Sequence, residues 1–270
     1  LLSKAILMGE ATWSVALPVV GSSLVYAYLV LVAAARIFAS ESTMVGDAGR
    51  FALLTPRSQI VPKSAPSVSE ALVLTGVLFV VFYYGGTWLQ TRTPKAGLLV
   101  TLWLLLFAPV LGAAFYAKLD LRETFSIRAP RPGAFLGASL MGASGFVFVG
   151  AANAWLEKHV FKTPPELLER FAEELVRFMP DTSTPWGVAL LIFSFAISPA
   201  ICEEFVFRGF LLRGLRARMT SWGAVLVSAI VFGAFHLSLH RIFGTATLGI
   251  AMGYVVLRSG SIWTSVMLHA

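Results

Sequence analysis

The chain has 270 residues, of which 57% are hydrophobic and 13% are charged, and its mean hydropathy is +0.79. Soluble domains carry about 25% charged residues, so this composition excludes an ordinary water-soluble domain. The net charge of +7 does not indicate nucleic-acid binding, because the basic residues fall in short connections beside apolar stretches, as they do in membrane proteins. The composition therefore predicts a polytopic α-helical protein integral to a lipid bilayer, with no nucleic-acid partner.

Apolar stretches close to the roughly 20 residues that cross a bilayer recur along the chain. In chain order, the predicted spans are 13–38, 71–89, 97–117, 133–156, 186–212, 222–239, 243–257 and a last one that starts at 261. The predicted fold class is all-α, a polytopic transmembrane bundle of about eight helices. Because the chain starts at Leu1 rather than Met and stops inside an apolar segment, we expect both ends to be truncated.

Two segments interrupt this pattern. Residues 48–69 hold three prolines and scattered charges, which predicts a linker between a first segment, 1–47, and a main domain, 70–270. Residues 164–180 carry apolar side chains on one helical face and charged ones opposite. That pattern predicts an amphipathic helix that lies on the membrane as a lid or packs on the bundle.

Lys and Arg are more frequent on one side of the predicted spans, and we expect that side to be cytoplasmic. It collects Arg36, Arg50, Arg57, Lys63, Lys118, Arg122, Arg128, Arg131, Arg213, Arg216, Arg218 and Arg258.

Two adjacent glutamates, Glu203 and Glu204, lie inside the predicted span 186–212. An ionised carboxylate in hydrocarbon is costly, so it indicates a functional site by default. Neighbouring residues of a helix point about 100° apart, which gives the two glutamates different tasks. Arg208 lies four residues past Glu204, on the same face, where an ion pair forms readily. That pair leaves Glu203 free to act as a general base. The alternative is a structural ion-pair network that fixes helix register.

Two histidines also fall in or beside apolar spans. Glu203 and His236 are each roughly sixteen residues from the turn that joins their helices, so equal rise per residue brings them to the same depth. We therefore expect them to meet, directly or through a water. His269, from the last predicted span, is a third candidate for the same cavity. The alternative for both histidines is a packed or interfacial side chain.

These residues resemble the CPBP family, the CAAX prenyl endopeptidases and bacteriocin-processing membrane proteins. The matched family motifs are EExxxR at Glu203, Glu204 and Arg208, FxxxH at Phe232 and His236, and the first position of HxxxN at His269. The asparagine of the last motif would lie three residues beyond Ala270. The resemblance covers about residues 97–270.

The CPBP resemblance implies a helical bundle around an intramembrane polar cavity. It implies that Glu203 activates a water with help from His236, and that His269 and the asparagine bind the developing oxyanion. It also implies a peptide or protein substrate, which is prenylated in some members of the family.

Residues 1–47 are similar to the closing segment of ABC-2-type (NatB-like) permease subunits. This similarity implies an export permease fused to the protease domain, with an ABC transporter ATPase subunit as a partner. It keeps open a transport function in which Glu203 and Glu204 relay protons or sodium. A non-catalytic immunity or scaffold protein with the same fold is a further alternative. We predict an intramembrane endopeptidase of a bacterial or archaeal cell membrane.

The metal requirement is a separate question. A catalytic zinc needs three protein ligands and a water, and Glu203, His236 and His269 would provide three. The zinc motif HExxH is absent from the sequence. A metal-free mechanism with Glu203 as the base requires fewer coincidences, so we favour an enzyme that needs no cofactor, with zinc as the alternative.

Overall fold

The computed structural model describes residues 52–161, 169, 172–173, 176–236 and 239–270. All of them belong to the second of the two units into which the chain divides, Phe51–Ala270. The predicted span 13–38 and the permease-like segment 1–47 lie outside the described residues and stay predictions. Within the predicted amphipathic helix 164–180, the described residues from 169 to 178 are helical.

The described residues are helical, with one isolated bridge between Lys63 and Leu119 as the β pairing among them. The helices in this part of the chain that are long and apolar enough to cross a membrane are Val68–Arg92, Pro94–Tyr116, Pro132–Val160, Pro185–Leu215 and Ile242–Ser259. Each of these five helices lies within a few residues of a predicted span. The all-α prediction is therefore confirmed for the described residues, and the five helices indicate an integral membrane protein.

These long helices are built from shorter elements, several of which begin with a side-chain cap. In chain order the elements are α3 (Val68–Val81), η3 (Phe82–Gly86), α4 (Thr87–Arg92), α5 (Pro94–Val100), η4 (Thr101–Phe107), α6 (Ala108–Tyr116), α7 (Leu121–Thr124), α8 (Pro132–Leu156), η5 (Glu157–Phe161), α10 (Pro185–Ile192), η6 (Phe193–Ile197), α11 (Ser198–Glu204), η7 (Phe205–Leu211), α12 (Leu212–Leu215), α13 (Ser221–Phe235), α14 (Leu239–Ser259) and α15 (Ile262–His269). Ser67 and Glu70 form a reciprocal capping box at the start of α3. Thr184 and Thr220 accept from the backbone N–H groups that open α10 and α13.

One predicted span is shorter than expected. The sequence predicts 222–239, but α13 has 15 residues and ends at Phe235, fewer than the roughly 20 that cross a bilayer. The chain turns after His236 and returns as α14, which packs along α13. A Cβ added to Gly249 would lie 3.0 Å from the backbone of Ala229. The glycine therefore permits the close helix approach that small residues allow in membranes.

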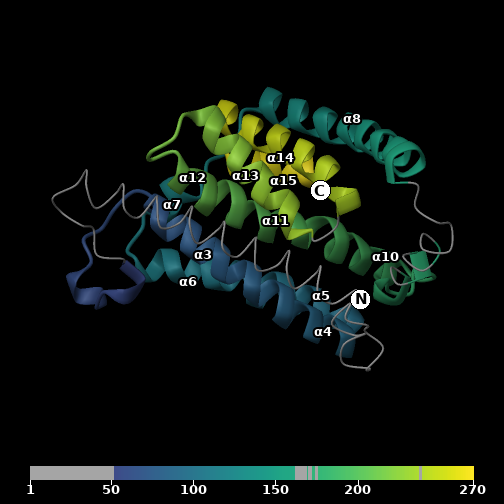
Figure 1. Cartoon of the computed structure of the whole chain (residues 1–270), viewed down its shortest axis with the longest axis horizontal. Helices are drawn as coiled ribbons and strands as arrows, with labels where there is room; N and C mark the ends of the chain where they lie inside the picture. Colours follow the sequence, from purple (N-terminus) through teal and green to yellow (C-terminus); the bar gives the residue numbers. More distant parts are fainter. Residues whose placement is uncertain (1–51, 162–168, 170–171, 174–175, 237–238) are drawn as a thin grey trace. The chain divides into compact units, whose positions relative to one another are not determined.

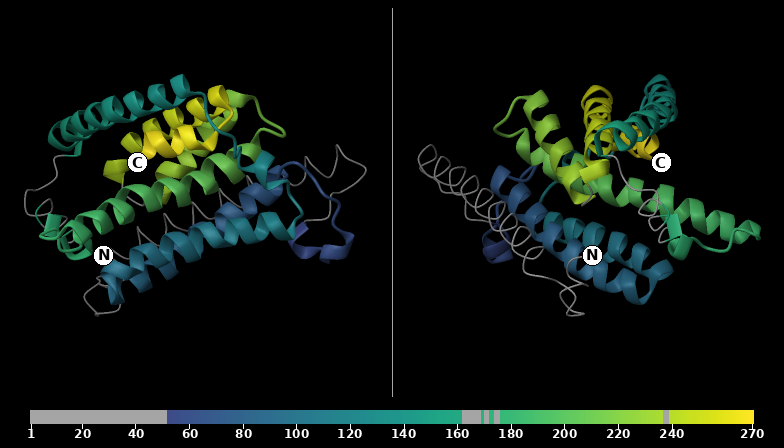
Figure 2. Two further views of the ribbon diagram at one scale, coloured as in Figure 1. Left: turned by 180° about the vertical axis from the view of Figure 1, so that it is seen from behind. Right: turned by 45° about the vertical axis from the view of Figure 1, so that its right-hand side comes forward.

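The helix Pro185–Leu215 lies at the centre of the described unit. In Figures 1 and 2 its elements α10, α11 and α12 run between two groups of helices, with α3 to α6 on one side and α13, α14 and α15 on the other. The outermost element beyond α14 and α15 is α8. Contacts join α11 to both η4 and α15, and α12 to α3. Side chains of the central helix can therefore reach both groups.

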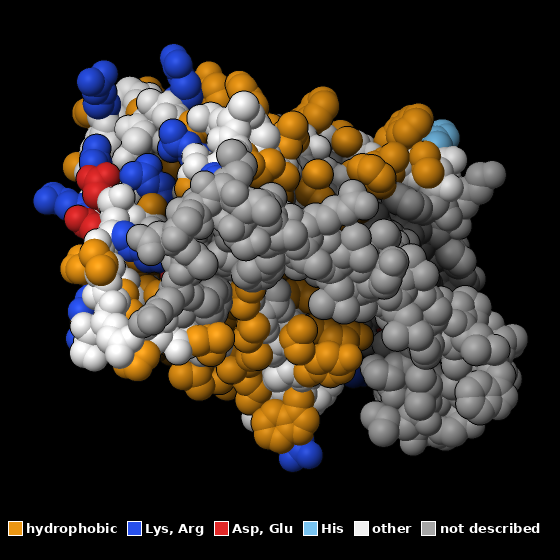
Figure 3. Space-filling model, turned by 60° about the vertical axis from the view of Figure 1, so that its left-hand side comes forward, with side chains coloured by type: hydrophobic (Ala, Val, Ile, Leu, Met, Phe, Trp, Pro, Cys, Tyr) orange, Lys and Arg blue, Asp and Glu red, His pale blue; other side chains and the backbone are white. Residues whose placement is uncertain are grey.

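The surface has two contrasting regions. Figure 3 shows Lys and Arg side chains gathered toward one end, with apolar side chains along the flank of the described helices. The exposed apolar residues of these helices include Val77, Val80, Leu104, Phe146, Phe148 and Ile230. An apolar flank with charged residues at its end is the surface expected of helices that contact lipid.

Candidate active site

The two adjacent glutamates lie at the end of α11, directly before the π-helical segment η7. Such segments occur frequently at functional sites, although the other long helices of the described unit carry them too, apart from Ile242–Ser259. The side chain of Glu204 is 0% exposed, whereas that of Glu203 is 14% exposed and lines a cavity. The angular separation predicted from helix geometry therefore places the two carboxylates in different surroundings.

Glu204 forms the predicted ion pair with Arg208. Nη1 of Arg208 lies 2.8 Å from Oε1 of Glu204, and both side chains are buried. The guanidinium also donates from Nη2 to the Gly249 carbonyl oxygen at 3.1 Å, and it lies over the ring of Phe232 at 4.4 Å from the centroid. Glu204 is thus held by a charge-assisted hydrogen bond, and this arginine is fixed from three directions.

His269 connects the two carboxylates. Its Nδ1 lies 2.9 Å from Oε1 of Glu204, and its Nε2 lies 3.9 Å from Oε2 of Glu203. An ionised Glu204 can only accept, so Nδ1 of His269 carries the proton that it donates. The second distance is too long for a hydrogen bond, but it leaves Nε2 facing the carboxylate of Glu203. The structure thus brings Glu203, Glu204, Arg208 and His269 together.

The position of His269 is set by the start and the packing of α15. Gly260 adopts a φ of +68° before the helix, a left-handed conformation that glycine takes without strain. The Ser261 side chain then accepts from the backbone N–H of Trp263 and donates to the carbonyl oxygen of Arg128 at 2.5 Å. On the other side, Gly142 of α8 lies against the backbone of Leu268, the residue before His269. These contacts direct the imidazole toward α11.

Glu203 and His236 line one cavity of about 260 Å³. The carbonyl oxygen of Phe232 lies 3.0 Å from Nδ1 of His236 and can only accept, so Nδ1 donates and Nε2 is left as an acceptor. Because this bond holds His236 at the end of α13, the described residues contain no direct contact between Glu203 and His236. Both side chains line the same cavity, and a contact between them through a water stays a prediction.

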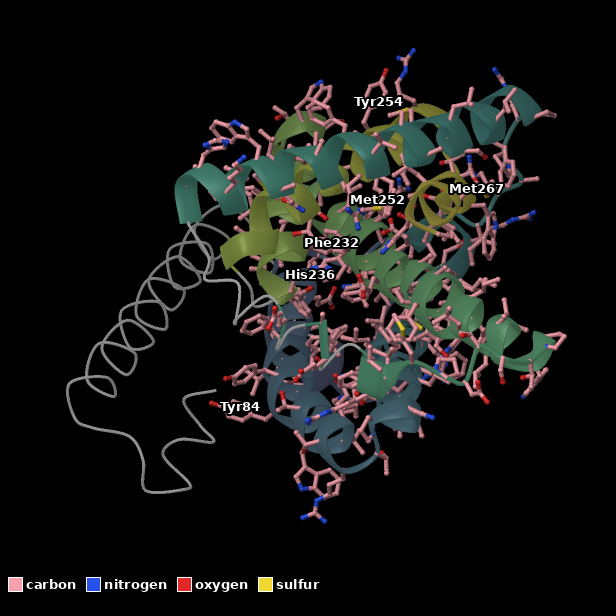
Figure 4. The ribbon with its side chains drawn as sticks, turned by 90° about the vertical axis from the view of Figure 1, so that its right-hand side faces the viewer. Tyr84, Phe232, His236, Met252, Tyr254 and Met267 are labelled. Carbon is pink, nitrogen blue, oxygen red and sulfur yellow. The ribbon has the colours of Figure 1, made fainter. Side chains whose placement is uncertain are left out.

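Phe232 is the hydrophobic centre of the site. Its ring lies edge-on to the rings of His236 and His269, with centroids at 4.9 Å and 5.8 Å, and it also lies beneath the Arg208 guanidinium. Figure 4 shows Phe232 and His236 between the two groups of helices. The ring therefore contacts both imidazoles and the arginine of the buried ion pair.

Several residues that line the cavity were not predicted as site residues. The helix Val68–Arg92 contributes Phe82, Tyr83, Thr87 and Gln90. Gln90 is held by a hydrogen bond from its Nε2 to Oγ1 of Thr101 at 3.4 Å. The signal in the sequence was weak, namely two uncharged polar residues near the end of an apolar span. Their hydrogen-bonding groups give the cavity a polar side opposite Glu203.

The three predicted zinc ligands do not form a metal cluster. No group of three or more His, Cys, Asp or Glu side chains that could hold a metal ion occurs within the described residues. Glu203, His236 and His269 all belong to that part of the chain, and Nδ1 of each histidine is engaged with an oxygen other than that of Glu203. What the arrangement offers is a cavity lined by the Glu203 carboxylate and the His236 imidazole, with Nε2 of His269 3.9 Å from that carboxylate.

Comparison with known proteins gives a match to the segment that carries this site. Residues 185–270 match the model of the type II CAAX prenyl endopeptidase Rce1-like family. No curated protein and no solved structure matches the chain. The permease similarity predicted for residues 1–47 lies outside the matched segment. The match contains every residue of the predicted motifs, from Glu203 to His269, and residues 185–270 are a domain of the Rce1-like (CPBP) family of type II CAAX prenyl endopeptidases.

Proposed function

We propose that this chain is an intramembrane endopeptidase in which Glu203 activates a water for attack on a peptide bond. The observation that carries the proposal is that the two carboxylates have different surroundings. Glu204 is buried against Arg208, whereas Glu203 faces the cavity. The family match to residues 185–270 supports a protease of this kind.

A position for the water follows from the distance between Glu203 and His269. Two atoms 3.9 Å apart can both reach one water at hydrogen-bond distances of about 2.8 Å. Such a water would donate to Oε2 of Glu203 and also to Nε2 of His269 when that imidazole is neutral. Both acceptors together direct a lone pair of the water oxygen into the cavity, toward a bound carbonyl carbon.

The proposed reaction is the addition of this water to the carbonyl group, followed by cleavage of the C–N bond. The water transfers one proton to Glu203 while its oxygen bonds to the carbonyl carbon, which gives a tetrahedral oxyanion. Glu203 passes this proton to the leaving amine as the C–N bond breaks. A histidine can donate to the oxyanion from Nε2 only when its ring is protonated, because Nδ1 already carries the proton in the neutral form of both His236 and His269. Oxyanion stabilisation by His269, as implied by the CPBP resemblance, therefore requires its imidazolium form.

The proposed substrate is a peptide or protein segment that enters from the membrane. The family's name refers to CAAX prenyl endopeptidases, so a peptide with a prenylated cysteine is the first substrate class to test. We place the enzyme in the cell membrane of a bacterium or archaeon. A link to an ABC transporter ATPase subunit depends on the permease-like segment 1–47 and is proposed with it.

The experiment compares wild type, Glu203→Gln and the control Glu173→Gln, an exposed glutamate outside the spans, after reconstitution into liposomes. The probe is a peptide that ends in a CAAX sequence, with and without a farnesyl group, and mass spectrometry detects the cleaved products. We expect cleavage by wild type and the control, and none by Glu203→Gln at unchanged thermal stability. Full cleavage by Glu203→Gln would refute the assignment. Proton or sodium flux without any cleavage would support ion coupling instead.

A further inference from the structure

A second cavity, of about 90 Å³, lies beside the buried ion pair but away from Glu203. Four arginines line it, namely Arg128, Arg208, Arg213 and Arg216. It lies among the connection after α7, the element α12 and the turn between α14 and α15. Arg128, Arg213 and Arg216 belong to the predicted cytoplasmic side, and Figure 3 shows Lys and Arg side chains gathered toward one end of the described unit.

The charges around this second cavity do not balance. Glu123 is the carboxylate in its lining, and it pairs with Arg128 and, at 3.5 Å, with Arg213. Arg216 pairs with no carboxylate in the part of the chain that the structure describes, and Arg208 is already neutralised by Glu204. The rim therefore has three arginines but one carboxylate, which is shared by two of them, and this leaves an excess of positive charge in a confined space.

The wall of the second cavity also contains a buried donor without an acceptor. Arg208 is 2% exposed, and its Nε has no hydrogen-bond partner within the described residues. Buried donors of this kind nearly always have a partner in a folded protein. An oxygen of a bound anion is a suitable partner, since the guanidinium groups present several N–H donors that match the oxygens of a phosphate.

We propose that this cavity binds the phosphate group of an anionic phospholipid. Basic pockets between membrane helices on the cytoplasmic side recognise anionic headgroups, and this cavity opens where the helices Pro185–Leu215 and Ile242–Ser259 end. Arg128, Arg213 and Arg216 form the rim, and Arg208 forms the buried wall. Free phosphate has the same chemistry, so the two sources must be separated by experiment. The proposal does not rest on the proposed hydrolysis, because its evidence comes from the arginines of this cavity and its test measures binding rather than cleavage.

The test measures ligand binding rather than cleavage. The full chain, purified in a neutral detergent, is titrated with phosphatidylglycerol, phosphatidylcholine or inorganic phosphate, and the rise in its unfolding temperature is followed. The variants are Arg216→Gln and a matched control, Arg218→Gln, an exposed arginine two residues further on that does not line the cavity. The unfolding temperature without ligand verifies that each variant folds.

We expect phosphatidylglycerol to stabilise wild type and Arg218→Gln with the same saturating dependence. Arg216→Gln should weaken binding by about tenfold, the size expected when one charge-assisted contact is lost. Phosphatidylcholine should bind more weakly than phosphatidylglycerol. Saturable stabilisation by inorganic phosphate that Arg216→Gln weakens would also support the site and would identify free phosphate as its ligand. No saturable effect of any probe, or equal weakening by Arg218→Gln, would overturn the proposal.

Discussion

Replacing Arg208 by Met should destabilise the protein strongly, and replacing Glu204 by Gln in addition should recover much of the loss. The change Arg208→Met keeps a long side chain but removes the charge that neutralises Glu204. The carboxylate is fully buried, and the imidazole of His269 also contacts it. In the double variant Glu204→Gln/Arg208→Met, the Gln side chain still offers an oxygen to Nδ1 of His269.

The expected loss of stability follows from the burial of the ion pair. Breaking a buried ion pair by removing one partner costs about 3–5 kcal/mol, because the other charge is left uncompensated. Arg208→Met also deprives the Gly249 carbonyl oxygen of its donor, which contributes about 1 kcal/mol. The double variant keeps this smaller loss but has no uncompensated charge. Its free energy of unfolding should therefore be about 1–2 kcal/mol lower than that of wild type.

The assay is equilibrium unfolding in mixed micelles with increasing denaturing detergent, followed by tryptophan fluorescence. Wild type, both single variants and the double variant form a cycle, which isolates the energy of the pair. We expect the double variant to be more stable than either single variant. If the two single losses instead add up in the double variant, Glu204 and Arg208 do not depend on each other and the reasoning fails.

Other variants test the surroundings of the pair. Gly142→Ala should lower the free energy of unfolding by about 1–3 kcal/mol and reduce cleavage, since the new Cβ would lie 2.6 Å from the Leu268 carbonyl oxygen next to His269. The control Gly137→Ala, on the same helix but with open space around it, should change neither stability nor cleavage. His269→Gln should lower the cleavage rate by about a hundredfold or more, the usual size for a lost acid–base group. His236→Gln should lower the rate less, because His236 contacts neither carboxylate. A larger effect of His236→Gln than of His269→Gln would contradict the arrangement described. Metal analysis of the purified protein should give no stoichiometric zinc and chelators should leave cleavage unchanged, whereas zinc lost together with activity would establish a metal enzyme.

The long helices of the described unit could be predicted from the sequence, because hydropathy and length are local properties. The predicted spans 133–156 and 243–257 differ from the observed Pro132–Val160 and Ile242–Ser259 by four residues or fewer at each end. The length of α13 could not be predicted in this way. Its apolar run continues past residue 235, and the turn at His236 depends on how α14 packs back against α13, which is a tertiary contact.

Within the site, the sequence predicted the contact made inside one helix, but for residues on other helices it predicted only that they gather, not which atoms they contact. The contact between Glu204 and Arg208 follows from a spacing of four residues. The contact between Glu204 and His269 joins residues 65 positions apart, and no periodicity indicates it. The same holds for Gln90 and Tyr83, which line the cavity of Glu203 because their helix packs on the central helix through α3.

His269 connects two neighbouring glutamates that have different surroundings. Helix geometry turns Glu204 toward α14 and α15 and turns Glu203 toward the cavity, so neither carboxylate can replace the other. His269 touches Glu204 with one ring nitrogen and faces Glu203 with the other. The tautomer that Glu204 selects therefore decides whether the nitrogen beside Glu203 accepts or donates. Arg208 is thus connected to Glu203 through Glu204 and His269 without touching it.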